Sequence, residues 1–172
     1  TTVADRRIRC HKTTGHGTQT FTQTVMNSCN PAFIEWGRRV GVDNFYTYID
    51  KLGLTSKTGI DIAGEAGTII HKKENVGEVE LATMSFGQSF QITPMQMLRA
   101  AAAIVNGGNL VTPHFAIRTC AADKTTYSEF SYSTTQEAVS KETSDTMKDI
   151  LRQVVEEGGG KNAYIEGFSI GG

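Results

Sequence analysis

Ser28 and Asn30, which a single residue separates, are the side chains of this sequence whose types and spacing could do chemistry together. A serine hydroxyl both donates and accepts a hydrogen bond, and an asparagine amide offers one acceptor and two donors. Groups of these two types take part in hydrogen bonding and proton transfer where rigid elements on both sides fix their geometry, but their spacing alone assigns them no role.

Two thiols and an imidazole, from Cys10, His16 and Cys29, form a second set. Zinc prefers such ligands, and a fourth group completes the usual tetrahedron. His11 is the fourth candidate within the chain, with Asp5 behind it and an acidic residue upstream equally open. The spacing Cys-x5-His-x12-Cys is not a familiar paired-cysteine motif, so the pattern alone is a weak signal.

The location of these residues strengthens the zinc hypothesis. The loop that carries Cys10 and His16 leads directly into the predicted helix 18–27, and Cys29 follows the end of that helix. Two alternatives stay open: free cysteines, or a Cys10–Cys29 disulfide, which is natural outside the cytoplasm. The sequence favours zinc with a structural role, in which all ligand positions are closed and the metal braces the loop around Ser28.

Two helical patterns meet at Ser28. Phe21 and Val25 lie four residues apart within the predicted helix 18–27, and apolar residues recur at helical spacing over the predicted helix 31–40. Pro31 fits the first turn of the second helix, with Asn30 as its N-cap. Taken alone, this pattern predicts a capped helix start and no chemistry.

Glycines and apolar periodicity predict the other elements. Helix 31–40 ends at Gly41, and Thr93, Pro94 and Gln96 form a capping box for a largely apolar, buried helix. The remaining predictions are a helix over 44–52, short strands within 56–70, a helical turn over 80–84, an extended segment over 110–117, a surface excursion or hairpin over 120–135, a helix over 140–157 and a strand over 164–170.

Ser28-Cys29-Asn30 resembles the S-x-N motif of the penicillin-binding proteins, the second of three motifs after S-x-x-K and before K-T-G. The sequence is similar to a class B penicillin-binding protein (a D,D-transpeptidase) of a Gram-positive bacterium, most of all to the division, elongation and sporulation enzymes. The other stretches that carry the resemblance are Gly15–Phe21, Leu81–Gln88, Ile92–Pro94 and Gly158–Gly172.

The resemblance implies an α+β fold, part of a β-lactamase/transpeptidase-like fold in which helices flank an antiparallel sheet beside a mostly helical subdomain. Residues 1–172 are then a partial transpeptidase domain, truncated at both ends. The chain contains no S-x-x-K, and Lys57-Thr58-Gly59 precedes a stretch remote from the site. The K-T-G motif is expected immediately after Gly172, so we expect this chain to be inactive by itself.

The resemblance also implies roles for the two polar residues. Ser28 would relay a proton between the lysines and the departing nitrogen, while Asn30 would hold the substrate amide and fix the rotamer of the nucleophile's lysine. The implied substrates are D-Ala-D-Ala stem peptides of peptidoglycan, and β-lactams would acylate the enzyme. The alternatives are a D,D-carboxypeptidase or β-lactamase-like hydrolase, a β-lactam sensor and a zinc-braced scaffold without activity.

Composition and charge place further bounds on function. The chain has 38% hydrophobic and 20% charged residues, and its net charge of -1 gives no reason to expect a nucleic-acid partner. No stretch approaches the ~18 apolar residues of a membrane span. The resemblance implies an extracytoplasmic location, an upstream transmembrane anchor and membrane partners in cell-wall synthesis. The resemblance also implies that catalysis requires no cofactor.

Overall fold

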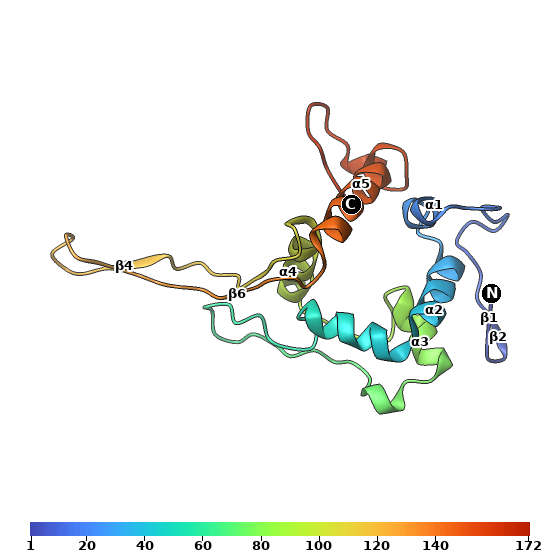
Figure 1. Cartoon of the computed structure of the whole chain (residues 1–172), viewed down its shortest axis with the longest axis horizontal. Helices are drawn as coiled ribbons and strands as arrows, with labels where there is room; N and C mark the ends of the chain where they lie inside the picture. The colour runs from blue at the N-terminus through green and yellow to red at the C-terminus, as the bar shows by residue number, and fades with distance from the viewer. The chain divides into compact units, whose positions relative to one another are not determined.

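The computed structural model describes residues 1–172, and the chain divides into two compact units. The first unit comprises residues 1–47, 70–90 and 145–172, and the second comprises 48–69 and 91–144. Helices α2 (Asn30–Lys51) and α5 (Lys141–Glu156) each begin in one unit and end in the other (Figure 1). None of the helices combines the length and the apolar character that crossing a bilayer requires.

The first unit is mostly helical. Beside the first part of α2 and the second part of α5, it contains the strand pair β1 (Thr2–Val3) and β2 (Arg6–Arg7), α1 (Phe21–Met26), α3 (Glu78–Ser85) and the short 3-10 helices Lys73–Asn75 and Lys161–Ala163. One cluster of its core consists of Val3, Ile34 and Ala82, against which Ile8 and Phe86 pack. This core holds the β1–β2 pair, α2 and α3 together.

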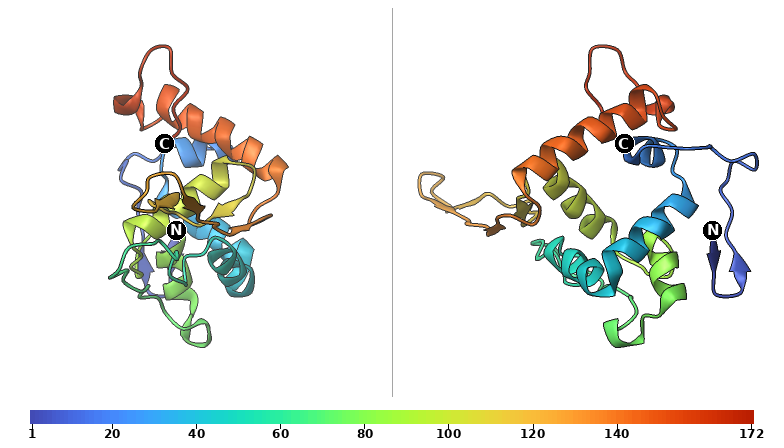
Figure 2. Two further views of the ribbon diagram at one scale, coloured as in Figure 1. Left: turned by 90° about the vertical axis from the view of Figure 1, so that its left-hand side faces the viewer. Right: turned by 45° about the vertical axis from the view of Figure 1, so that its right-hand side comes forward.

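Helices α2 and α3 lie side by side in this unit (Figure 2). A Cβ atom added at Gly37 of α2 would lie 1.8 Å from the hydroxyl oxygen of Ser85, so no larger residue fits there. The Ser85 hydroxyl donates a hydrogen bond to the Leu81 carbonyl at 2.6 Å. This side chain therefore has a structural role between the two helices.

The predicted break at Gly41 is confirmed. Gly41 has φ 74° and ψ 163°, a conformation outside the helical region, within the span of α2. Glycine adopts a positive φ without steric cost, so the chain can bend here between two helical segments. The predicted helices 31–40 and 44–52 are these two segments.

The second unit contains the second part of α2, α4 (Pro94–Val105) and the first part of α5. Its antiparallel strand pairs are β3 (Leu110–Val111) with β6 (Thr134–Thr135) and β4 (Arg118–Cys120) with β5 (Tyr127–Glu129). Ala103, Leu110 and Ala138 form its core, with Leu52 packed against them. The β4–β5 pair forms a hairpin that begins two residues before the segment 120–135, for which a surface excursion or hairpin was predicted, and it extends as a long exposed arm (Figure 1).

The capping box of α4 is confirmed. Thr93 Oγ1 accepts from the Gln96 amide at 3.1 Å, and Gln96 Oε1 accepts from the Thr93 amide at 2.8 Å. Gln96 is fully buried, and its Nε2 donates to the Ser56 carbonyl and to Thr68 Oγ1, both at 2.7 Å. The prediction of a buried helix holds for one face of α4, with Gln96, Ala100 and Ala103 buried, but Leu98 keeps 63% of its surface exposed.

The α+β class is confirmed, but the strands in this chain form only two-stranded antiparallel sheets. The strands predicted within 56–70 are absent apart from a single bridge between Ile69 and Gln91. Within this segment, the Glu65 carboxylate accepts hydrogen bonds from the backbone N–H groups of Thr58 and Gly59. In a strand, these N–H groups would donate to a neighbouring strand instead.

The strand predicted over 164–170 is also wrong. Gly167 has φ 83°, and the Phe168 amide donates to the Ile165 carbonyl at 3.2 Å. These features close a turn in the middle of the segment. Alternating apolar residues specify a strand only when a partner strand accepts their backbone hydrogen bonds.

Candidate functional site

Ser28 lies in the turn that ends α1. The Cys29 amide donates to the Thr24 carbonyl at 3.1 Å, and the Ser28 amide donates to the Val25 carbonyl at 2.9 Å. These two bonds define a Schellman motif with Asn27 as the C-cap. Ser28 therefore occupies the left-handed position, with φ 45°, that usually belongs to glycine.

Asn30 is the first residue of α2 rather than its N-cap, so the predicted capping role is wrong. The Phe33 amide donates to the Cys29 carbonyl at 3.1 Å, which makes Cys29 the residue before the first helical turn. The side chains of Ser28 and Asn30 make no hydrogen bond within the chain. Ser28 is exposed and Asn30 is half-buried, so both polar groups are available to a ligand.

Side chains upstream hold this turn in place. Thr20 and Gln23 form a capping box at the start of α1, with the Thr20 amide donating to Gln23 Oε1 at 2.9 Å. At the other end of the helix, Asn27 Nδ2 donates to Gln19 Oε1 at 2.7 Å. The short helix is thus tied to the preceding loop immediately before Ser28.

The structure brings Cys10 and His16 together, with His11 as their third neighbour. One ligand atom from each of the three residues lies within 4.8 Å of the others. Cys10 Sγ lies 3.4 Å from His16 Nδ1 and 3.7 Å from His11 Nδ1. The pKa of His16 is below its ordinary value because of burial and the nearby charges of Lys12 and His11.

Cys29, the third predicted metal ligand, lies outside this cluster. It is 7% exposed and follows Ser28 into α2. All three cysteines are free thiols, so the Cys10–Cys29 disulfide is not formed. The ligand set that the geometry assembles is Cys10, His11 and His16.

Glycines shape the loop that carries this cluster. Gly15 and Gly17 have φ 75° and 67°, and the Gly15 amide donates to the Lys12 carbonyl at 2.9 Å. The left-handed backbone on both sides of His16 turns the chain back, which places its ring beside Cys10.

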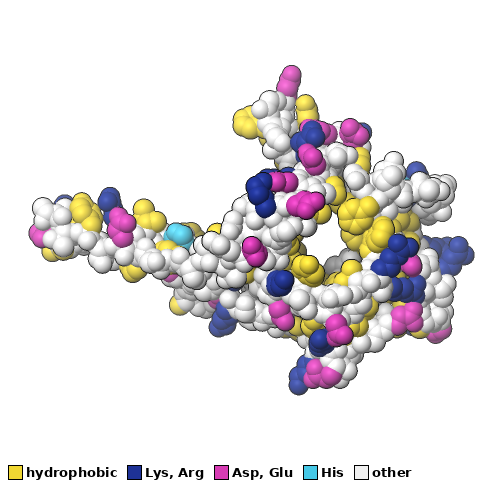
Figure 3. All heavy atoms as spheres, in the orientation of Figure 1, with side chains coloured by type: hydrophobic (Ala, Val, Ile, Leu, Met, Phe, Trp, Pro, Cys, Tyr) yellow, Lys and Arg dark blue, Asp and Glu magenta, His cyan; other side chains and the backbone are white.

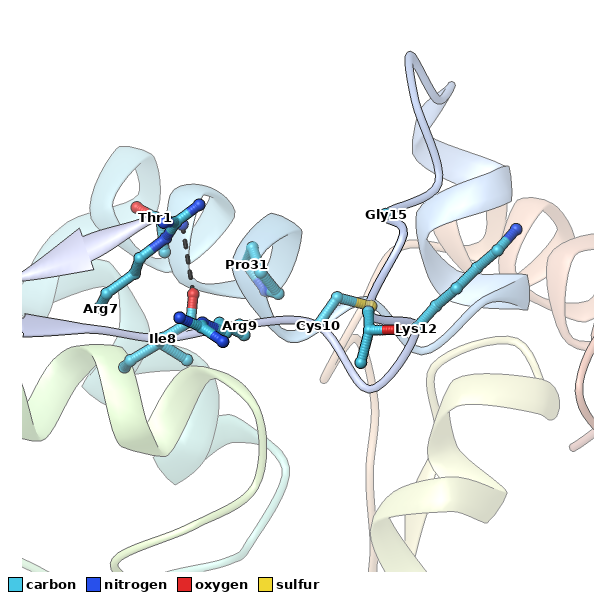
Figure 4. Close-up of a pocket in the computed structure, with 9 residues that line it drawn as sticks. Thr1, Arg7, Ile8, Arg9, Cys10, Lys12, Gly15 and Pro31 are labelled. Carbon is cyan, nitrogen blue, oxygen red and sulfur yellow. Dashed lines mark hydrogen bonds between the residues drawn. The ribbon is translucent and has the colours of Figure 1, made fainter.

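A pocket of about 400 Å³ lies between this loop, the N-terminal strand pair and the start of α2 (Figure 4). Arg7, Arg9 and Lys12 line it together with Cys10 and Pro31. No acidic residue lines the pocket, so its three cations give it a positive charge.

Comparison with known proteins identifies the chain. The family described as penicillin binding protein transpeptidase domain matches residues 1–172. The chain therefore belongs to the transpeptidase domain family of the penicillin-binding proteins, as the resemblance implied.

Its relatives narrow the type. The chain is 44% identical over 171 residues to stage V sporulation protein D of Bacillus subtilis, covering 99% of this chain and 26% of that protein. The chain thus spans about a quarter of the length of the curated relatives it matches. The prediction of a class B penicillin-binding protein of sporulation or division type is confirmed.

Solved structures agree with this assignment. Penicillin binding protein 3 of Mycobacterium tuberculosis, crystallised in complex with aztreonam, matches with a TM-score of 0.79 and 27% identity, covering 85% of this chain and 34% of that one. The D,D-transpeptidase domain of a peptidoglycan glycosyltransferase from Eggerthella lenta has the same fold, with a TM-score of 0.87 at 22% identity, covering 100% of this chain and 45% of that one.

Proposed function

We propose that the full-length protein carrying this chain is a peptidoglycan D,D-transpeptidase, which cross-links stem peptides by serine acyl transfer and is acylated by β-lactams. Membership of the transpeptidase family and 44% identity to a sporulation protein support the proposal. The observation that carries it here is the pair Ser28 and Asn30, whose polar side chains have no partner within the chain.

Ser28 acts in this proposal as the proton relay. Its hydroxyl can accept a proton from the lysine of the S-x-x-K motif and donate one to the leaving nitrogen. Asn30 holds the amide of the substrate and orients that lysine through its donor and acceptor groups. Their position between two helices limits the motion of both side chains, as acyl transfer requires.

Labelling of the full-length protein with a fluorescent penicillin tests the proposal. We expect covalent labelling of the wild type, and a loss of about 10²-fold in acylation rate for Ser28→Ala, in the range typical of general acid–base groups. Ser89→Ala is the matched control, because Ser89 is also exposed and has a left-handed φ of 66°. A wild type that stays unlabelled contradicts the proposed function.

We also propose that the loop before α1 binds one structural zinc ion through Cys10 and His16. The distance of 3.4 Å between Cys10 Sγ and His16 Nδ1 supports it, since both atoms can approach a common metal. The third ligand is His11, which the geometry already includes, or Cys29 after a shift of the loop.

Metal analysis of the purified full-length protein tests this second proposal. We expect stoichiometric zinc in the wild type and in Cys120→Ser, whose thiol is exposed on the β4–β5 arm, and no zinc in Cys10→Ser. Loss of zinc in His11→Ala or in Cys29→Ser identifies the third ligand. A wild type without zinc contradicts the proposal.

We further propose that the protein acts outside the cytoplasm, anchored by a transmembrane helix upstream of this chain, together with membrane partners in cell-wall synthesis. Its relationship to a sporulation protein and to penicillin-binding proteins supports this location. Protease added to intact protoplasts is expected to digest this domain while a cytoplasmic marker stays intact, and a protected domain contradicts it.

A further inference from the structure

The last carbonyl of α1 receives its hydrogen bond from a distant part of the sequence. The final turn of a helix leaves carbonyl groups without partners in the helix. In α1, three of the last four carbonyl groups accept hydrogen bonds from residues that follow closely in the chain. Asn27 N–H donates to the Gln23 carbonyl, Cys29 N–H to the Thr24 carbonyl and Ser28 N–H to the Val25 carbonyl. The fourth carbonyl, that of Met26, accepts from the Gly159 amide at 3.1 Å.

Gly159 belongs to the turn that follows α5. The three glycines Gly158–Gly160 end this helix, and the turn lies beside α1 in Figures 1 and 2. Both elements belong to the first compact unit. Met26 is only two residues before Ser28, so the bond connects the end of α5 to the turn that carries the motif.

Close approach explains why one of these positions is glycine. A Cβ atom at Gly158 would lie 2.9 Å from the Met26 carbonyl oxygen and 2.8 Å from the Val154 carbonyl oxygen. Both neighbours are backbone atoms, which cannot move aside as the end of a flexible side chain can. At Gly159 the same atom would lie 3.6 Å from the Met26 oxygen, an ordinary van der Waals distance.

We propose that the Gly158–Gly159 turn is a positioning element for Ser28. The Gly159 amide fixes the Met26 carbonyl, and the absence of a side chain at Gly158 allows the two backbones to meet. The left-handed Ser28 depends on its neighbours to hold a conformation that serine disfavours. The turn after α5 thereby determines where the Ser28 hydroxyl points, although neither glycine contacts substrate.

The inference rests on the proposed acyl transfer. Two single variants of the full-length protein, Gly158→Ala and Gly159→Ala, test it. Rates of labelling over a series of fluorescent penicillin concentrations give the limiting acylation rate and the half-saturating concentration. For Gly158→Ala we expect the limiting rate to fall at least about tenfold, because small displacements of a catalytic group are costly. The half-saturating concentration should change little. Gly159→Ala keeps the amide and has room for a methyl group, so it should stay within about twofold of the wild type.

A double-mutant cycle separates positioning from general destabilisation. If Gly158 acts through the Ser28 hydroxyl, Gly158→Ala has no further effect on the acylation rate in a Ser28→Ala background. Multiplicative losses in the double variant, or a wild-type rate for Gly158→Ala, would overturn the inference. A wild type that does not label at all instead defeats the proposed function, so the two failures are distinguishable.

Hydrogen exchange keeps the inference testable if Gly158→Ala does not fold. Thr20→Ala removes the side-chain cap of α1 without touching the turn after α5. If that turn is bonded to α1, the Gly159 amide should exchange several-fold faster in this variant than in the wild type. The Gly160 amide, which donates to the Val154 carbonyl of α5, is the internal control. Unchanged exchange at Gly159 would contradict the coupling.

Discussion

Ser28 holds the backbone conformation that the turn after α1 requires, at a cost in stability. A non-glycine residue in the left-handed region costs about 1 kcal/mol relative to glycine, and such strain is often found where function requires a particular side chain. Here the side chain in question is a hydroxyl without a partner. The residue type thus serves the proposed chemistry rather than the fold.

Ser28→Gly is therefore expected to separate stability from activity. Glycine relieves the left-handed strain, so the free energy of unfolding should rise by about 0.5–1 kcal/mol. The acylation rate should fall as far as in Ser28→Ala, because both variants lack the hydroxyl. Denaturant unfolding and fluorescent penicillin labelling of the same preparations measure the two effects. A variant that is less stable and labels normally would contradict this account.

At the residue scale, the sequence identified Ser28 and Asn30 through the resemblance to a known motif. It did not indicate that Ser28 is left-handed, because serine is not the residue type that signals this conformation. Asn30 was misplaced by one residue, since either of two neighbouring carbonyls can begin a helix. The role of Gly159 was missed because three consecutive glycines after α5 indicate only a helix end.

The capping boxes of α1 and α4 have the same sequence pattern, but they are expected to contribute differently to stability because only one of them is buried. Gln96 at the start of α4 is fully buried and bonds the loop 54–68, whereas Gln23 at the start of α1 is exposed and bonds only the Thr20 amide. Removal of a buried partner leaves other polar groups unsatisfied. The two helices therefore offer a matched pair of variants.

Gln96→Ala should lower the free energy of unfolding by about 2–4 kcal/mol, since the Ser56 carbonyl and Thr68 hydroxyl lose their donor. Gln23→Ala should cost about 0.5–1 kcal/mol, as for an exposed cap. Denaturant unfolding monitored by circular dichroism measures both. Equal losses in the two variants would show that burial of Gln96 adds nothing to its capping role.

Asp61 anchors the base of the β4–β5 arm. Its carboxylate accepts the Ala116 amide at 2.7 Å and the Phe115 amide at 2.9 Å, and the Tyr132 hydroxyl lies 3.1 Å away. These bonds hold the pKa of Asp61 below its ordinary value of 3.8, and the bond from the Ala116 amide has the largest effect. Because the pKa of Asp61 is lower in the folded state than in the unfolded state, its ionised carboxylate stabilises the fold. This stabilisation is fully present above pH 3.8, the unfolded pKa, and is lost as the pH falls through the folded pKa.

The arm is accordingly expected to detach from its base in acid. The Phe115 and Ala116 amide resonances should shift together with a midpoint below 3.8, as followed by NMR during acid titration. In Asp61→Asn the same resonances should show no such titration, since the amide does not ionise. A midpoint at or above 3.8 in the wild type would exclude the anchoring role.

Across the whole molecule, the sequence pattern of neighbouring residues predicted the helices better than the strands. Capping residues and glycines mark where α4 begins and where α2 bends, because these are properties of neighbouring residues. Strands depend on partners elsewhere in the chain, so the apolar residues of 56–70 and 164–170 indicated strands that do not form. The hydrophobic side chains on α4 predicted burial, yet Met97, Leu98 and Val105 are exposed. Figure 3 shows that hydrophobic side chains, in yellow, reach the surface in several places.

The 172-residue chain on its own is expected not to react with penicillin. Acyl transfer needs a nucleophile with a base beside it, and the sequence has no S-x-x-K. Ser28 cannot replace that serine, because its hydroxyl makes no hydrogen bond to any basic group. A fluorescent penicillin should therefore label the full-length protein at a serine outside residues 1–172, as located by mass spectrometry of the labelled peptide. Labelling of the isolated chain at Ser28 would instead make Ser28 the nucleophile, and the relay mechanism would be wrong.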